Sequence, residues 1–221
     1  MSYYKIKNLE EYFKHYKKSV REPRKFWEKV ASENFTWYQE WDKVVDFNMA
    51  EAEIKWFTNA KVNIVKNCID RHLAKKGDKT AIIFEPNDPT EQALHITYNE
   101  LHERVCKMAN VLKEQGIEKG DRVCIYLPMI PELAISILAC ARIGAIHSVI
   151  FAGFSASAVN SRINDSQCKM VITSDGGYRG NKTIDLKSIV DEALLNSPSV
   201  KNVLVVKRIN TDIDMKEGRD Q

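Results

Sequence analysis

The sequence predicts an α/β fold with a mostly parallel sheet flanked by helices, preceded by a helical, aromatic-rich N-terminal cap. From about residue 79, strand-like runs alternate with helical patterns, which is typical of β-α-β units. Several of these runs, such as KMVITS and NVLVVK, are almost continuously apolar, as expected for strands that are buried on both faces. All four tryptophans lie in the first 75 residues, where aromatic and charged residues are frequent.

Residues 1–78 are expected to form the cap. Helical spacing predicts a helix over residues 8–20, which Pro23 ends or interrupts, and a second helix over residues 24–33. Residues 36–47 are expected to be extended. Residues 63–77 predict one helix that stops at Gly77. Its apolar face would consist of Ile64, Val65, Cys68, Ile69 and Leu73.

Residues 79–221 are expected to form the α/β part. Strands are predicted at 80–85, 93–97, 121–127, 147–151, 169–174 and 202–207. Helices are predicted at 97–114, 131–142, 155–165 and 185–197. The TYNE stretch fits a capping box, because Thr97 can accept from an early helix amide while the Glu100 carboxylate reaches back.

Composition excludes several classes of protein. The chain has 221 residues, 44% of them hydrophobic and 29% charged, and its net charge of +3 is too small to indicate nucleic acid or an anionic membrane. The N-terminus has no signal peptide pattern, so a cytoplasmic location is expected. Five cysteines without a CxxC spacing, and scattered histidines, indicate neither a disulfide framework nor a metal site.

Two loops are candidate sites, because ligands of open α/β sheets gather at the carboxyl ends of the strands. One is FAGFSAS, residues 151–157, and the other is GGYRGNKT, residues 176–183. The second nearly matches the phosphate-loop motif GxxxxGK[ST], but Asn181 occupies the position where that motif requires glycine. The helix that follows also begins late, so a P-loop NTPase is disfavoured.

The basic residues of GGYRGNKT suggest another use. Arg179 and Lys182 are separated by Gly180 and Asn181, two residues that tolerate unusual backbone angles, so the loop can turn both cations to one side. Such a pair suits a terminal phosphate monoester, with a forked contact from arginine and a point charge from lysine. A solvated basic turn is the alternative that composition alone favours.

Several stretches together resemble the AMP-forming acyl-CoA synthetases of the adenylate-forming superfamily, and within them the acetyl-CoA synthetase group. They include ARIGAIHSVIFAGFS and KMVITSDGGYRGNKTIDLK, and the resemblance runs from about residue 24 to the end of the chain. The aromatic N-terminal portion, with KFWEKVA, is similar to the cap of that group. The resemblance implies that residues 79–221 are the first part of the AMP-binding N-domain.

The resemblance also implies a reaction. Acetate and ATP give acetyl-AMP and pyrophosphate, and the thiol of coenzyme A then attacks the adenylate to give acetyl-CoA and AMP. The loop of Arg179, Gly180, Asn181 and Lys182 would bind the nucleotide end of coenzyme A, with its basic side chains near the 3′-phosphate. The loop of Phe151, Ala152 and Gly153 would lie beside the same adenine, and Ile184 is a further candidate for packing on it. Asn181 departs from the glycine that the family usually has.

The family's ATP loop, its magnesium-binding acid and its catalytic lysine have no counterpart in these residues. The expectation is therefore an N-terminal part of an acetate–CoA ligase, without catalytic or metal-binding residues and inactive alone. Its partners would be acetate, ATP and coenzyme A, with Mg²⁺ in the full-length parent. The alternatives are a propionyl- or acetoacetyl-CoA synthetase, or a non-catalytic coenzyme A or nucleotide-binding module.

Overall fold

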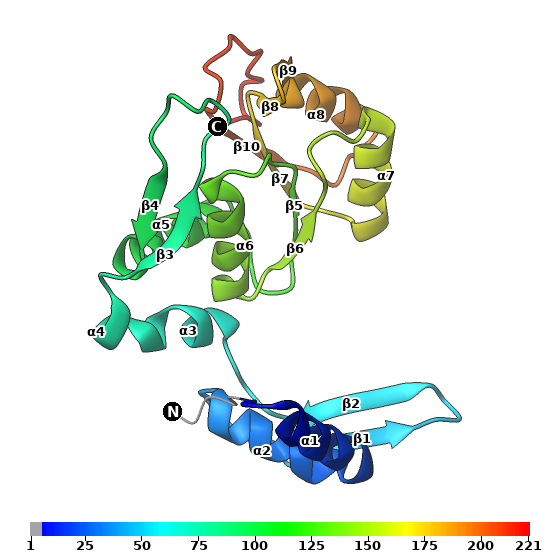
Figure 1. Cartoon of the computed structure of the whole chain (residues 1–221). Helices are drawn as coiled ribbons and strands as arrows, with labels where there is room; N and C mark the ends of the chain where they lie inside the picture. Colours follow the sequence, from blue (N-terminus) through cyan, green and yellow to red (C-terminus); the bar gives the residue numbers. More distant parts are fainter. Residues whose placement is uncertain (1–5) are drawn as a thin grey trace. The chain divides into compact units, whose positions relative to one another are not determined.

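The computed structural model describes residues 6–221, which divide after Asn67 into two compact units (Figure 1). Each unit is described by itself below. The cap boundary expected after residue 78 stays a prediction, since compactness alone does not define where a cap ends. Among the described residues, no helix is long and apolar enough to cross a membrane.

Two helices open the first unit. Helix α1 spans Leu9–Arg21, and the Asn8 side chain caps it by accepting from the Glu11 amide. Helix α2 spans Pro23–Asn34 and begins at the proline itself, whose missing N–H costs nothing in the first turn. The two predicted helices and the interruption between them are therefore confirmed.

A β-hairpin follows the two helices. Strands β1, Lys43–Asn48, and β2, Glu53–Thr58, pair antiparallel. The extended segment predicted over residues 36–47 becomes a strand only at Lys43, and the second strand was not predicted. Aromatic packing holds this region together, because the Trp37, Trp41 and Phe57 rings lie with centroids 4.9–5.5 Å apart.

The prediction of one helix over residues 63–77 is wrong. The segment is divided into α3, Ile64–Cys68, a 3₁₀ turn, Asp70–His72, and α4, Leu73–Lys76, which ends before Gly77 as expected. The break falls at Ile69, whose backbone leaves the helical region, with φ −122° and ψ −69°. The predicted apolar face is split as a result: Val65 and Ile69 are buried, whereas Ile64 and Cys68 are exposed.

The second unit contains a four-stranded parallel sheet in the order β10-β7-β5-β6, which confirms the predicted fold class. Figure 1 shows α5 and α6 together on one side of this sheet, and α7 and α8 on the other. The strands are β5 Arg122–Ile125, β6 Ile146–Val149, β7 Met170–Ser174 and β10 Asn202–Val206. The helices are α5 Tyr98–Glu114, α6 Pro131–Ile143, α7 Ala156–Ser166 and α8 Leu186–Leu194.

Strands β3, Thr80–Phe84, and β4, Leu94–Thr97, lie outside the parallel sheet. They pair antiparallel with each other. Both strands were predicted, but the sequence did not show that they would form a separate pair. The capping box at the start of α5 is confirmed, because the Glu100 amide donates to Thr97 Oγ1 over 3.2 Å and the Thr97 amide donates to Glu100 over 2.7 Å.

Burial within the sheet follows strand position. Every residue of the central strand β7 is buried, as the continuous apolar run predicts. Strand β6 is an edge and departs from that expectation, with Ile146 and Val149 54% and 47% exposed. All five cysteines are free thiols; three are buried, and burial raises the pKa of Cys124, of Cys140 to about 12, and of Cys168.

Candidate functional site

The glycine-rich segment is a hairpin, not an open loop. Strands β8, Gly177–Arg179, and β9, Lys182–Ile184, pair antiparallel, with Arg179 directly opposite Lys182. Directly opposed residues project from the same face of a hairpin, so the register sets both cations on one side. Gly180 has φ +60°, and Asn181 is absent from the positive-φ residues, a pattern typical of a type II′ turn. The second turn position therefore does not require glycine, which accounts for Asn181.

A buried carboxylate anchors the start of this hairpin. Asp175 follows β7 and accepts four backbone N–H groups, from Gly176, Arg208, Ile209 and Asn210, over 2.7–3.1 Å. Burial alone would raise the pKa of Asp175, but these four donors together lower it below its ordinary value. The ionised carboxylate thus ties the loop after β10 to Gly176, the residue just before the hairpin.

Two glycines let the chain pass close to its neighbours here. A Cβ at Gly176 would lie 2.4 Å from the Ile209 Cδ1 atom and 2.8 Å from the Ile184 carbonyl oxygen. A Cβ at Gly177 would lie 3.2 Å from a side-chain carbon of Pro128. The two glycines therefore serve close backbone approach rather than the wrapping of a phosphate.

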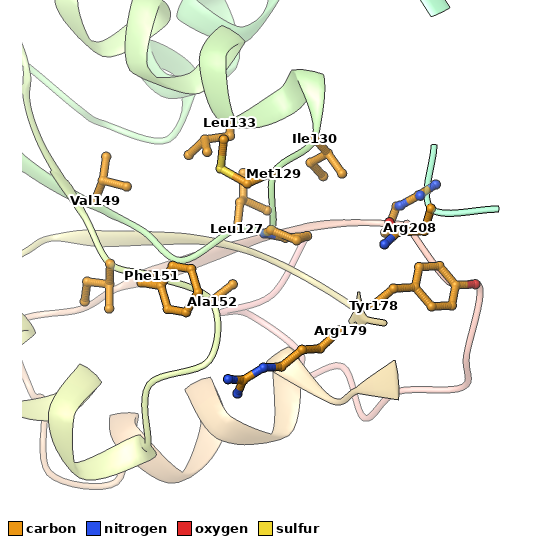
Figure 2. Close-up of a pocket in the computed structure, with 13 residues that line it drawn as sticks. Leu127, Met129, Ile130, Leu133, Val149, Phe151, Ala152, Tyr178, Arg179 and Arg208 are labelled. Carbon is orange, nitrogen blue, oxygen red and sulfur yellow. The ribbon is translucent and has the colours of Figure 1, made fainter. Parts of the chain in front are cut away.

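A cavity of about 480 Å³ lies at the carboxyl ends of the parallel strands (Figure 2). Three loops line it: residues 127–130 after β5, residues 150–152 after β6, and Tyr178 and Arg179 after β7. Arg208, which follows β10, completes the wall. Strands β5 and β7 are neighbours whose following connections lead to opposite faces of the sheet, the position where such folds bind ligands.

The cavity wall is apolar and carries two positive charges. Its charged lining residues are Arg179 and Arg208, and no carboxylate lines it. The Arg208 guanidinium lies over two aromatic rings, 5.5 Å from the Phe84 centroid and 5.4 Å from the Tyr178 centroid. Among the described residues, neither arginine forms an ion pair. This arrangement suits an anionic ligand with an aromatic or apolar body.

The loop after β6 presents an aromatic ring at the cavity. The buried Tyr126 hydroxyl donates to the Phe154 carbonyl over 2.8 Å and so fixes the end of the loop. Phe151 is 62% exposed, and its ring meets the Phe154 ring edge to face at 6.0 Å. A Cβ at Gly153 would lie 3.1 Å from the Phe151 ring, so glycine leaves room for that ring.

The predicted site residues are brought together only in part. Phe151, Ala152 and Arg179 line the cavity, and Gly180 and Asn181 line an adjacent hollow of about 400 Å³. Lys182 lies opposite Arg179 on the hairpin, and Gly153 supports the Phe151 loop. Ile184 packs against the buried core and lines neither hollow.

Of the residues that line the cavity, the sequence predicted only Phe151, Ala152 and Arg179 as site residues, and those that it did not predict include Tyr178 and Arg208. Arg208 could have been found from the rule already applied to the two loops, because it too follows the carboxyl end of a parallel strand. Tyr178 lies inside the glycine-rich segment itself, next to Arg179.

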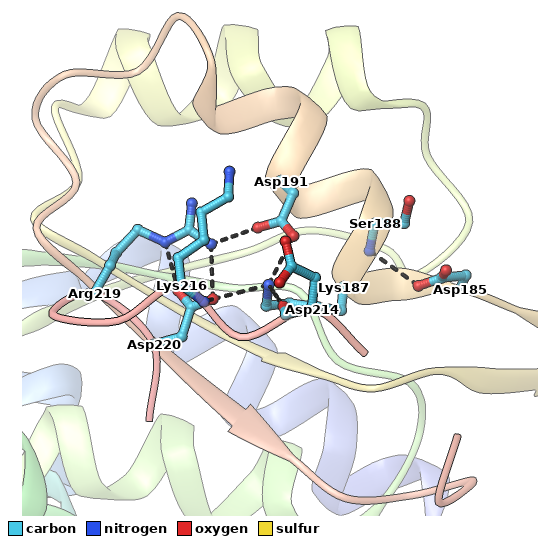
Figure 3. A network of polar contacts seen from close by, with 8 residues as sticks. All are labelled: Asp185, Lys187, Ser188, Asp191, Asp214, Lys216, Arg219 and Asp220. Atoms are coloured by element: carbon cyan, nitrogen blue, oxygen red, sulfur yellow. Dashed lines mark hydrogen bonds and ion pairs between the residues drawn. The ribbon is translucent and has the colours of Figure 1, made fainter. Parts of the chain in front are cut away.

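A buried ionic network supports the helix that follows the hairpin (Figure 3). Helix α8 starts at the Asp185 cap, and its Lys187, 1% exposed, donates to Asp191, Asp220 and the Asp214 carbonyl over 2.7–2.9 Å. Arg219 also pairs with Asp191 and Asp220. The network fixes the segment 214–220 against α8, and the backbone of residues 219–221 continues along the outer edge of β10.

The described residues contain no group of three or more histidine, cysteine, aspartate or glutamate side chains that could hold a metal ion. The cavity wall offers two guanidinium groups and an exposed aromatic ring, while Lys182 lines neither hollow and lies opposite Arg179 on the hairpin. Its chemistry is that of binding an anion, because the charged side chains that line it are both arginines.

Two family models match the chain. The AMP-binding enzyme model matches residues 69–220, and the model of the acetyl-coenzyme A synthetase N-terminus matches residues 12–68. The two matches adjoin near the division between the two compact units, which falls between Asn67 and Cys68.

Curated relatives point the same way. The chain is 53% identical over 205 residues to an acetyl-coenzyme A synthetase of Alkalilimnicola ehrlichii, covering 93% of this chain and 32% of that protein. It is 48% identical over 213 residues to acetyl-coenzyme A synthetase 2 of Pseudomonas aeruginosa, covering 96% of this chain and 33% of the relative. The chain thus spans about a third of the length of these relatives.

A solved structure shares the fold. The acetoacetyl-CoA synthetase from Streptomyces lividans superposes with a TM-score of 0.83 at 26% identity, over 92% of this chain and 31% of that one. The AMP-binding enzyme model covers more than half of the chain, and the chain therefore belongs to the AMP-binding enzyme family.

Proposed function

We propose that the chain supplies the coenzyme A nucleotide subsite of an acetate–CoA ligase that forms AMP. In the complete reaction, acetate and ATP give acetyl-AMP and pyrophosphate, and the thiol of coenzyme A displaces AMP from the adenylate. The observation that carries the proposal is the Arg179–Lys182 pair on one face of a hairpin, beside an apolar cavity without carboxylates. The proposed substrates, acetate, ATP and coenzyme A, are small molecules, and the proposed location of the reaction is the cytoplasm.

The 3′-phosphate of coenzyme A is the anion that we assign to this pair. The Arg179 guanidinium can donate two hydrogen bonds to one phosphate, and the Lys182 ammonium adds a point charge from the opposite strand. Both side chains are exposed, and neither forms an ion pair within residues 6–221, so they are available without breaking an internal contact.

The adenine is assigned to the loop after β6. Phe151 offers an exposed ring, Ala152 lines the cavity beside it, and Gly153 leaves room for the ring. Base-to-ring stacking of this kind contributes about 1–3 kcal/mol per base. Ile184 supports the hairpin from the core side, and Gly180 and Asn181 shape the turn.

Acetate is the proposed acyl substrate because relatives named acetyl-coenzyme A synthetase are about twice as identical to this chain as the acetoacetyl-CoA synthetase structure is. Mg²⁺ is expected with ATP, but the described residues do not fit a magnesium site. No catalytic step is assigned to this chain's residues.

Substitution of Arg179 tests the subsite. In the full-length enzyme, Arg179→Ala should raise the KM for coenzyme A by roughly ten- to a hundredfold, because one charge-assisted contact of about 1.5–3 kcal/mol is lost. The acetate-dependent ATP–pyrophosphate exchange should stay unchanged, since it precedes coenzyme A binding. Lys207→Ala is the matched control, an exposed basic residue outside the cavity. An equal fall in the exchange rate would show that Arg179 acts elsewhere.

Assays of the 221-residue chain by itself test whether it is one part of a ligase or a complete binding module. We expect it to bind coenzyme A weakly and to form no AMP from ATP and acetate in a single-turnover assay. AMP formation would contradict this assignment of the chemistry. A gene product that binds coenzyme A but has no ligase activity at any length would instead favour a non-catalytic binding module.

A further inference from the structure

Arg208 is a second, separate cation in the cavity that the proposed coenzyme A subsite does not use. Its backbone amide is held by Asp175 over 2.7 Å, and its guanidinium lies over the Phe84 and Tyr178 rings. The side chain is therefore fixed at both ends, which lowers the entropy lost when it binds a ligand. Within the described residues it has no carboxylate partner.

The two arginines of the cavity are directed to different places. Figure 2 shows the Arg179 side chain extending toward the side of the Phe151 loop and away from Arg208, which lies beside Tyr178. They also come from different elements, since Arg179 ends β8 and Arg208 follows β10. One phosphate would draw both guanidinium groups toward a common point, whereas this arrangement suits two anionic groups set apart on one ligand.

We propose that Arg208 binds the 5′-diphosphate of coenzyme A, while Arg179 and Lys182 bind the 3′-phosphate. This inference rests on the proposed function. The nucleotide end of coenzyme A carries these two anionic groups on one ribose, next to an adenine that suits the apolar wall. Arg208 is thus a substrate-binding residue that determines recognition of the diphosphate.

Three ligands separate the two anionic groups. Coenzyme A carries both, 3′-dephospho-coenzyme A carries only the diphosphate, and adenosine 3′-monophosphate carries only the 3′-phosphate. Dissociation constants for the 221-residue chain can be measured by titration while the amide signals of residues 176–184 are followed by NMR.

We expect each arginine variant to lose affinity for a different pair of ligands. Arg208→Ala should weaken coenzyme A and 3′-dephospho-coenzyme A by roughly ten- to a hundredfold and leave adenosine 3′-monophosphate unchanged. Arg179→Ala should weaken coenzyme A and adenosine 3′-monophosphate and leave 3′-dephospho-coenzyme A unchanged. Lys207→Ala, the adjacent exposed cation, should change none of the three. Arg208→Lys should lose only part of the affinity, because lysine keeps the charge without the planar fork.

Each other pattern has its own meaning. If Arg208→Ala lowers the affinity for all three ligands equally, Arg208 only stabilises the hairpin through its contacts with Phe84 and Tyr178. That result would overturn the inference. No effect of Arg208→Ala on any ligand would overturn it as well, with the Arg179 assignment intact. Failure of the unsubstituted chain to bind any of the three would overturn the proposed function itself.

Discussion

At the scale of single residues, the site depends on groups that have no ligand-binding chemistry of their own. Asp175 collects four backbone donors and thereby joins the loop after β10 to the hairpin that bears Arg179. Gly176 lets the backbone pass between the Ile209 side chain and the Ile184 carbonyl. The positions of both cavity arginines therefore depend on two adjacent residues, one charged and one without a side chain.

Gly176→Ala should lower the free energy of unfolding by about 1–3 kcal/mol, because the added Cβ overlaps the Ile209 Cδ1 atom and a backbone oxygen that cannot turn away. The measurement is urea unfolding followed by circular dichroism, since all four tryptophans lie before Asn67 and report on the other unit.

Ile209→Ala supplies the matched comparison. In the double variant, part of the loss caused by Gly176→Ala should be recovered, because the nearest clashing atom is gone while the carbonyl contact at 2.8 Å remains. Strictly additive losses would contradict the steric explanation.

At the scale of elements, the hairpin β8–β9 is the unit that presents the cations, and its turn assigns different tasks to two adjacent residues. Gly180 adopts a positive φ in open space, whereas Asn181 does not. Helix α8 follows directly from the Asp185 cap, and the ionic network around Lys187 holds it to the segment 214–220. Each of these two elements gives one prediction.

Asn181→Gly should leave the affinity for coenzyme A within about twofold of the unsubstituted chain, because the second position of this turn does not need left-handed backbone. Gly180→Ala is the contrasting variant and should destabilise the hairpin by about 1–2 kcal/mol, the cost of a side chain at positive φ. NMR titration measures both effects. Equal weakening by the two variants would show that the turn type is assigned wrongly.

The buried network predicts acid sensitivity. Burial alone would raise the pKa of Asp220, but Arg219, Lys187 and the Lys216 amide lower it to about 2, below the ordinary value of 3.8. Because the folded pKa is depressed, the stability from ionised Asp220 is present above about pH 4 and is lost as the pH falls toward 2.

Asp220→Asn should therefore be less stable than the unsubstituted chain at neutral pH, and the difference should shrink between about pH 4 and pH 2. Denaturant unfolding across this pH range measures it. Asp212→Asn, at an exposed aspartate just before the segment 214–220, should show no such dependence. A difference that is constant with pH would mean that packing, rather than charge, explains the loss.

At the scale of the whole molecule, the parallel sheet of the second compact unit has two edges that differ. Residues 219–221 continue along the outer edge of β10, whereas β6 has no strand beside it within the described part of the chain. Ile146 and Val149 on β6 are about half exposed. An exposed apolar edge offers unpaired backbone groups to a second chain.

Ile146→Lys should reduce self-association of the 221-residue chain, because a charge on an edge strand opposes edge-to-edge pairing. Sedimentation velocity at increasing concentration measures it. Leu195→Lys, at an apolar position 73% exposed after α8, is the control for added charge and solubility. An equal effect of both variants would show that net charge, and not the β6 edge, limits association.

The sequence by itself determined what short-range patterns encode. The order of strands and helices after residue 79, the Thr97–Glu100 capping box and the placement of the Phe151 and Arg179 loops at strand ends follow from periodicity, caps and the topology of parallel sheets. These features depend on residues within a turn or two of each other, so a single sequence is enough to predict them.

Only the tertiary structure decided which segments meet. The antiparallel pairing of β3 with β4 and the approach of Arg208 to Phe84 and Tyr178 join residues that are distant in the sequence. The break in the helix at Ile69 and the register that sets Arg179 opposite Lys182 are local, but the residue pattern did not specify them. Strand propensity does not specify a pairing partner, and a lone arginine after a strand carries no local sign of the rings that hold it. The place of Arg208 after β10 is readable from the sequence, whereas its contact with the two rings is evident only in the folded chain.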